Sequence, residues 1–188
     1  MDRRPGSPRP STRAAAEPRN GRSSSLEAER RRVSGLLAME AEARALGARA
    51  VAGVDEAGRG ALAGPVYAAA VVLPPEPALL GLDDSKRLAP EVREDLARRI
   101  RAVAVAWGVG SSTAAEIDGL GIAPASFLAM RRALAALEGR GARPGLVLVD
   151  GFPIPALPLP QRAVVKGDAT VACIAAASIL AKTARDRM

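Results

Sequence analysis

Two acidic residues stand side by side at the end of an apolar, strand-like run in the octapeptide GVDEAGRG, residues 53–60. Asp55 and Glu56 would raise each other's pKa unless a cation lay between them, and a divalent metal ion is the natural cation. Asp150 ends a second apolar run in the string LVDG, and Asp168 follows a third in VVKGD. Four acids in the same strand-then-turn setting predict a site for a hard cation.

Such a site suits the hydrolysis of phosphodiesters with the help of two divalent metal ions. Mg²⁺ and Mn²⁺ prefer oxygen ligands, so a carboxylate cluster without histidine fits them. In this mechanism one ion activates the attacking water and a second, about 3.5 to 4 Å away, stabilises the departing oxygen. Taken singly, each motif is more typical of an ordinary turn, since an apolar run followed by Asp-Gly usually marks the end of a strand. The prediction therefore depends on the motifs together.

The composition excludes several kinds of active site. The chain has 188 residues, no histidine and one cysteine. It cannot build a Ser-His-Asp triad, a Cys-His dyad, an HExxH zinc site or an internal disulfide. Cys173 lies in an apolar, helix-like stretch, where a buried structural thiol is the usual case. Aromatic residues make up 2% of the chain, so Ala, Val and Leu must fill the core and the elements must pack closely.

The net charge of +7 is unevenly distributed. Residues 1–50 carry 11 Lys or Arg against 6 acids, and residues 51–188 carry 16 against 14. We expect residues 1–25 to be a disordered basic leader, which either adds weak attraction to phosphates or is a dispensable solvated tail. The longest apolar runs have 13 residues, short of the roughly 18 to 20 that span a bilayer. With no secretory signal, we expect a cytoplasmic protein without membrane contact.

The elements that must position the four acids form one α/β domain, which we expect over residues 26–188. The pair Thr113 and Glu116 predicts a capping box at the start of a short helix. Hydrophobic periodicity and turn residues predict the other elements. We expect strands at 49–54, 65–73, 102–111 and 146–149, a short extended segment at 163–166, and helices at 26–46, 90–100, 124–139 and 170–185.

The order of these elements predicts a mixed sheet. The short glycine-rich turn favours an antiparallel pair of first and second strands, and the third strand extends this meander. The later strands alternate with helices, so the first and fourth strands can be neighbours. Asp55 and Asp150 would then converge at adjacent strand ends, and Asp168, near a helix start, could reach the same point.

Several separated strings resemble the ribonuclease HII family in both wording and order. They are GVDEAGRG with LAGPV after it, DDSKRL, LVDG, VVKGD and AASILAKTARDR, and they extend from about Met39 to Met188. The resemblance implies a ribonuclease H-like mixed sheet flanked by helices. It also implies an endonuclease, dependent on Mn²⁺ or Mg²⁺, that hydrolyses the RNA strand of RNA–DNA hybrids. Such an enzyme also cuts DNA duplexes 5′ of embedded ribonucleotides, leaving a 3′-hydroxyl and a 5′-phosphate.

The resemblance assigns roles position by position. The four acids that catalyse and bind metal fall on Asp55, Glu56, Asp150 and Asp168. The turn implied to recognise the ribonucleotide's 2′-hydroxyl, largely through main-chain groups, falls on Gly58, Arg59 and Gly60. Without a Cβ, glycine lets the backbone approach the sugar. The residues implied to contact phosphate are Ser85 and Lys86.

Two departures from the family pattern stand out. Ala61 replaces the proline that commonly follows the glycine-arginine-glycine turn, and relatives continue for about 50 residues beyond Met188, within the usual size of a domain. That segment would carry a tyrosine that stacks on the sugar, so we expect the domain over residues 26–188 to be C-terminally truncated. The alternative is therefore an impaired remnant, or part of a longer parent, that only binds nucleic acid. Metal-dependent cleavage separates the two hypotheses. We expect a monomer.

Overall fold

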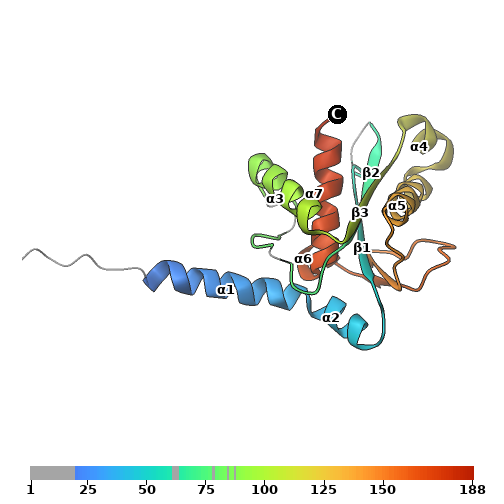
Figure 1. Cartoon of the computed structure of the whole chain (residues 1–188). Coiled ribbons are helices and arrows are strands. Elements are labelled where there is room, and N and C mark those ends of the chain that lie inside the picture. The colour runs from blue at the N-terminus through green and yellow to red at the C-terminus, as the bar shows by residue number, and fades with distance from the viewer. Residues whose placement is uncertain (1–19, 61–63, 78, 84, 87) are drawn as a thin grey trace, which may run out of the picture.

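The computed structural model describes residues 20–60, 64–77, 79–83, 85–86 and 88–188. It is an α/β fold in which helices flank both faces of a five-stranded mixed sheet (Figure 1). The strands are β1 (Val51–Ala57), β2 (Val66–Val72), β3 (Ala106–Ser112), β4 (Leu146–Asp150) and β5 (Gln161–Val164). The helices are α1 (Asn20–Leu36), α2 (Ala38–Ala45), α3 (Pro90–Val103), α4 (Ala114–Leu120), α5 (Ile122–Glu138), α6 (Gly167–Thr170) and α7 (Ala172–Asp186).

The sheet has the order β3-β2-β1-β4-β5, so β1 is its central strand. β1 pairs antiparallel with β2, and β2 pairs antiparallel with β3. β4 lies parallel to β1 and to β5. The predicted meander and the predicted neighbourhood of first and fourth strands are both confirmed. The register places Val54 opposite Val149, so the next residue on each strand, Asp55 and Asp150, arrives at the same end of the sheet.

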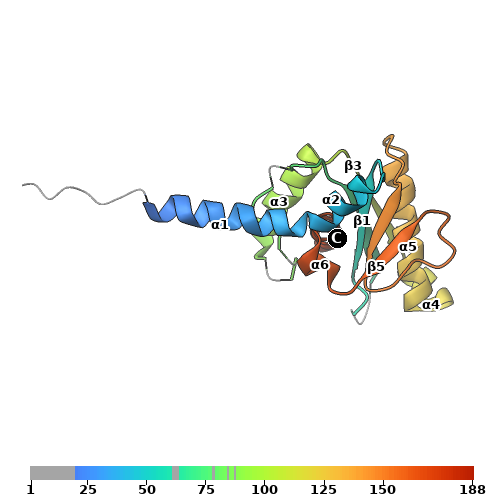
Figure 2. The ribbon, with the colours of Figure 1, turned by 90° about the horizontal axis from the view of Figure 1, so that it is seen from below.

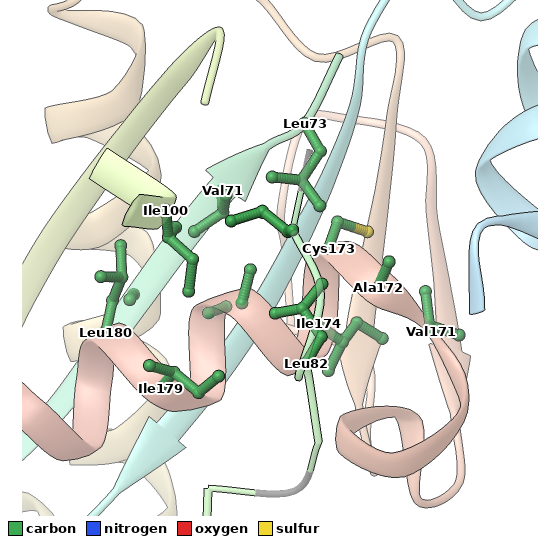
Figure 3. Packing of buried hydrophobic residues seen from close by; sticks show 14 of the residues in the cluster. Val71, Leu73, Leu82, Ile100, Val171, Ala172, Cys173, Ile174, Ile179 and Leu180 are labelled. Atoms are coloured by element: carbon green, nitrogen blue, oxygen red, sulfur yellow. The ribbon is translucent and has the colours of Figure 1, made fainter. Parts of the chain in front are cut away.

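The two faces of the sheet are covered by different helices. α3 and α7 lie on one face and α5 lies on the other (Figures 1 and 2). Under α7 the core contains mainly medium-sized aliphatic side chains (Figure 3), among them Val71, Ile100, Ile174, Ile179 and Leu180. Every residue of α7 from Ala172 to Ala181 is buried. The small side chains that the composition predicted allow this close packing.

Some element boundaries differ from the prediction. The third strand begins at Ala106 rather than at residue 102, because α3 continues to Val103. A short apolar run does not by itself distinguish helix from strand. Pro124 lies inside the first turn of α5 and not at its start. This is tolerated because the first helical N–H groups have no partner within the helix.

The expected helix over 26–46 is two helices, with a turn at Leu37 between α1 and α2. α1 begins at Asn20, before the predicted start of the domain, and extends away from the sheet (Figures 1 and 2). Residues 1–19 of the predicted leader, and Ala61, lie outside the described residues. Over the ranges that are described, no helix has both the length and the hydropathy needed to cross a membrane.

Candidate active site

Three carboxylates meet at one end of the sheet. Asp55 comes from the central strand β1 and is 5% exposed, Asp150 ends β4, and Asp168 lies in the first turn of α6 and is 7% exposed. One oxygen from each side chain lies within 4.8 Å of the other two. The strand register positions the first two, and the short connection from β5 to α6 brings the third. The predicted convergence of these residues therefore exists in the structure.

The turn that leads into α6 fixes two of the acids. The main-chain N–H of Gly167 donates a hydrogen bond of 2.7 Å to Oδ1 of Asp150. Lys166, just before it, has a left-handed backbone with φ of 55°, which turns the chain from β5 into the helix. The Nζ atom of Lys86 lies 3.4 Å from Oδ2 of Asp168. Asp168 is thus held beside a cation that is itself 77% exposed.

The proximity of the acids changes their proton affinity. Burial, followed by the charges of Glu56 and Asp150, raises the pKa of Asp55 well above its usual value, although a hydrogen bond with Ser178 opposes the rise. Burial and the charge of Asp168 raise the pKa of Asp150, against the opposing hydrogen bond from Gly167. A bound cation would stabilise the ionised carboxylates and so oppose these rises in pKa.

Glu56 differs from the other three acids. Successive residues of a strand point to opposite faces, and the Glu56 carboxylate is not among the three whose oxygens lie within 4.8 Å. It lies 3.6 Å from the guanidinium of Arg59 instead. Burial raises the pKa of Glu56, the charge of Arg59 opposes this, and the charge of Asp150 adds to it. Glu56 thus lies at the margin of the cluster, where the charge of Asp150 affects its pKa.

The turn after β1 leaves its main chain accessible. Gly58 has φ of +110°, a conformation that side chains other than glycine rarely adopt. A Cβ at this position would lie 2.9 Å from the carbonyl oxygen of Pro65 and 3.0 Å from Nε of Arg185. Arg59 and Gly60 are exposed. Glycine is therefore needed at the first of these positions to form the turn, and the next two residues face solvent.

The two predicted phosphate contacts lie in different surroundings. Lys86 is exposed, whereas Ser85 is buried and its Oγ lies 2.9 Å from Oγ of Ser178. The Ser178 side chain in turn lowers the pKa of Asp55. Ser178 lies in the string AASILAKTARDR and has no predicted role. The available signal was a serine in an otherwise apolar helical run.

Arg93 is a second residue that the sequence analysis missed. It is 8% exposed, and its guanidinium donates to the carbonyl oxygens of Ser85 at 2.9 Å and Leu88 at 3.1 Å, and to Asp186 at 2.8 Å. It therefore holds the loop that carries Lys86 against α3 and α7. The available signal was its position on the apolar stripe of α3, spaced by three, four and seven residues from the buried Leu96, Ala97 and Ile100.

The acids do not line the apolar groove between α1, α2 and the segment 75–80. That groove has a volume of about 840 Å³, with Arg99 of α3 at its edge. Its lining is mainly apolar and includes none of the nine predicted site residues. The chemistry of the carboxylates, and not the depth of a cavity, therefore identifies the candidate site.

The donor atoms of the cluster fit a hard divalent cation. All three are carboxylate oxygens, two of the three side chains are buried, and their mutual repulsion needs a positive charge nearby. Neither histidine nor a second cysteine exists in the chain to favour a softer metal. The residues present are therefore compatible with Mg²⁺ or Mn²⁺.

Comparison with known proteins decides the family. The model of the family described as Ribonuclease HII matches residues 52–188, which contain all of the sheet except Val51 and all of the candidate acids. The chain belongs to the ribonuclease HII family. It is therefore a metal-dependent hydrolase of the ribonuclease H type, and the resemblance seen in the separated strings is confirmed.

Individual relatives agree with this assignment. The chain is 53% identical over 160 residues to a ribonuclease HII of Moorella thermoacetica, covering 85% of this chain and 76% of that protein. It is 53% identical over 160 residues to a ribonuclease HII of Rhodococcus opacus, covering 84% and 70%. The structure of ribonuclease H2 from Pyrococcus horikoshii superposes with a TM-score of 0.59 at 30% identity, covering 73% of this chain and 72% of that one. The ribonuclease H-like fold is confirmed.

Proposed function

We propose that this ribonuclease HII chain hydrolyses the RNA strand of RNA–DNA hybrids and cuts DNA duplexes 5′ of embedded ribonucleotides, leaving a 3′-hydroxyl and a 5′-phosphate. The observation that carries the proposal is the meeting of Asp55, Asp150 and Asp168, whose carboxylate oxygens lie within 4.8 Å of one another. All three lie within the family match. Membership of the family supports the choice of nucleic-acid substrate.

Asp55, Asp150 and Asp168 would hold the metal, with Glu56 at the margin as a fourth acid. When bound, two Mg²⁺ or Mn²⁺ ions would supply the activation of water and the stabilisation of the departing oxygen. The protein's part is to keep the carboxylates in place. Asp150 is fixed by the N–H of Gly167, and Asp55 by the N–H of Glu56 at 2.7 Å together with Ser178.

The residues beside the cluster would bind the nucleic acid. Lys86 presents an exposed ammonium next to Asp168 and would attract a phosphate as a point charge. The accessible main chain of Gly58, Arg59 and Gly60 would approach the 2′-hydroxyl, the group that distinguishes RNA from DNA. Ser85 would act indirectly, since its hydroxyl is paired with Ser178.

The test is cleavage of an end-labelled DNA duplex that contains one ribonucleotide, with Mn²⁺ or Mg²⁺ and with a chelator. An all-DNA duplex and an Asp150→Asn variant are the controls. We expect one metal-dependent cut on the 5′ side of the ribonucleotide, absent from both controls. A folded wild-type chain that binds the duplex without cutting it would instead support the nucleic-acid-binding alternative. Monomeric state and cytoplasmic location stay predictions.

A further inference from the structure

A buried carboxylate outside the metal site lies at the start of α7. Glu40 of α2 is 0% exposed, and its Oε1 accepts a hydrogen bond of 2.8 Å from the main-chain N–H of Cys173. Cys173 is the second residue of α7, and the residue before the helix, Val171, has no side chain that can cap it. The first N–H groups of a helix have no partner inside the helix. Glu40 therefore supplies, from another helix, the acceptor that α7 lacks locally.

This contact is costly to maintain, which argues that it has a role. Burial raises the pKa of Glu40, against the hydrogen bond with Cys173, and its second oxygen, Oε2, has no hydrogen-bond partner in the described part of the chain. A buried, half-satisfied carboxylate carries a desolvation cost, of which the positive end of a helix dipole offsets only part. Well-packed apolar residues in place of buried charged groups are often neutral or stabilising. Stability is therefore a weak explanation for Glu40.

The same end of α7 touches the central strand. A Cβ on Gly53 of β1 would lie 2.2 Å from the carbonyl carbon of Cys173, so the helix and strand backbones are in direct contact there. A residue with a Cβ would therefore not fit at this position. Glu40 binds the N–H of the residue whose carbonyl group rests on Gly53. The two contacts together fix the position of the first turn of α7 along β1.

From this point α7 leads to the metal site. Gly53 and Asp55 lie on the same face of β1, separated by about 6.6 Å along the strand. Cys173 and Ser178 are separated by about 7.5 Å along the helix. The two axial spacings are similar, so a helix anchored with Cys173 over Gly53 places Ser178 at the level of Asp55, whose pKa the Ser178 hydroxyl lowers. A shift of the anchored turn along β1 would carry Ser178 away from the carboxylate.

We infer that Glu40 is a positioning residue for the metal site, which acts by fixing α7 on β1 so that Ser178 holds the Asp55 carboxylate. Glu40 precedes the residues 52–188 that the family model matches. The inference rests on the proposed function, because it requires Asp55 to be a metal ligand. It predicts that a change at Glu40 alters the metal site without touching it.

The test compares Mn²⁺ binding, measured by calorimetry, in E40Q, S178A and the double variant. E42Q is the matched control, because Glu42 is an exposed glutamate of the same helix. Circular dichroism establishes that each variant is folded. E40Q keeps the size of the side chain and an acceptor oxygen, but it removes the charge that faces the helix dipole. Cleavage of the ribonucleotide-containing duplex is then measured over a range of Mn²⁺ concentrations.

We expect E40Q to bind Mn²⁺ about tenfold more weakly than E42Q, the lower end of the range for outer partners of metal ligands. Its cleavage should recover as Mn²⁺ is raised. Its effect should not add to that of S178A, because both act through the same contact. A purely structural residue would lower the melting temperature but leave the Mn²⁺ affinity of the folded protein unchanged.

The inference is overturned if folded E40Q binds Mn²⁺ as tightly as E42Q does. It is also overturned if the effect of E40Q on Mn²⁺ affinity adds in full to that of S178A. If E40Q does not fold, E40D is measured in the same way, since it keeps the charge but shortens the reach to Cys173. Failure of both to fold would assign Glu40 to folding alone and overturn it too. Failure of the proposed function gives a different result, in which the wild-type protein binds Mn²⁺ no better than D55N.

Discussion

Gly167 lies so close to Asp150 and Ile174 that a Cβ on Gly167 would have to displace one of them. The N–H of Gly167 lies 2.7 Å from Oδ1 of Asp150, and a Cβ at residue 167 would lie 3.3 Å from the same oxygen and 2.6 Å from Cδ1 of Ile174. Asp168 is the next residue. One tight turn thus positions two of the three clustered acids, and a small change there should reach both.

Gly167→Ala should therefore damage the site as well as the fold. The new methyl group must displace either Ile174 or the Asp150 carboxylate, at a cost of about 1 to 3 kcal/mol in the free energy of unfolding, as for other overpacked positions. We expect metal-dependent cleavage to fall at least about tenfold, as for lost outer partners of metal ligands. Gly35→Ala is the control, since a Cβ there meets nothing within 4 Å. Wild-type cleavage by Gly167→Ala would contradict this account.

Asp55→Asn should abolish cleavage and yet stabilise the metal-free protein at neutral pH. Because the folded pKa of Asp55 is raised, the folded state binds the proton more tightly than the unfolded state. The stability of the metal-free protein therefore falls as pH rises from the unfolded value, about 3.9, through the raised folded value. Asparagine does not ionise, so the variant escapes this loss.

The measurement is the melting temperature in EDTA as a function of pH. Asp55→Asn should melt above wild type at neutral pH, and the difference should shrink as pH falls toward the unfolded pKa. Asp118→Asn, at an exposed position, should show no such trend. Added Mn²⁺ should raise the melting temperature of wild type only, since a ligand stabilises the state that binds it. An Asp55→Asn protein that melts below wild type in EDTA at neutral pH would refute the argument.

The sequence predicted the parts of the site that depend on topology. Asp55 and Asp150 end apolar runs, and a meander followed by helix–strand alternation makes their strands neighbours, so their convergence followed from the order of elements. The contact between Ser85 and Ser178 did not follow, because the two residues are 93 positions apart and neither lies in a motif that specifies pairing. The position of Arg93 on the apolar stripe of α3 indicated burial, but its partners could not be identified from the sequence because they come from a loop and a distant helix.

The remaining differences between the predicted and the observed structure lie where the local sequence fits more than one conformation. Ala102 and Val103 fit a helix or a strand equally well, and the packing of α3 decided for the helix. The pairing of Glu56 with Arg59 depends on the exact course of the turn after β1, which the glycines leave open. Glu56 was grouped with the other acids because it adjoins Asp55 and through the family resemblance, whereas the alternation of side chains along a strand points it to the other face.

Arg93→Met should loosen the loop that carries Lys86. The methionine keeps most of the side-chain volume but leaves the carbonyl oxygens of Ser85 and Leu88 without their donor. We expect a loss of about 3 kcal/mol in the free energy of unfolding, for one buried and one partly buried acceptor left unsatisfied, and weaker binding of the duplex. Chemical denaturation and duplex titration measure the two effects.

The control for Arg93→Met is Arg98→Met on the same helix, whose side chain is 70% exposed. Exposed ion pairs contribute about 0 to 1 kcal/mol, so this variant should resemble wild type in stability. Equal effects of the two substitutions would show that Arg93 does not hold the loop.

Gly58→Ala should reduce the preference for a ribonucleotide more than it reduces binding. An alanine at φ of +110° is strained, and its Cβ would press on the carbonyl oxygen of Pro65 and on Arg185, so the main chain of the turn must move. Recognition by main-chain groups depends on their position. We therefore expect the affinities for a ribonucleotide-containing duplex and for an all-DNA duplex to become similar.

Arg59→Ala tests the contribution of side-chain charge in the same turn apart from that of the main-chain conformation. It removes an exposed guanidinium but leaves the glycine-dependent backbone intact, so it should weaken binding to both duplexes by a similar factor. The weakening should be larger at low salt, where phosphate contacts contribute most. Titration of both duplexes with both variants at two salt concentrations distinguishes these effects. If Gly58→Ala keeps the full preference while Arg59→Ala loses it, a side chain, and not the main chain of the turn, reads the 2′-hydroxyl.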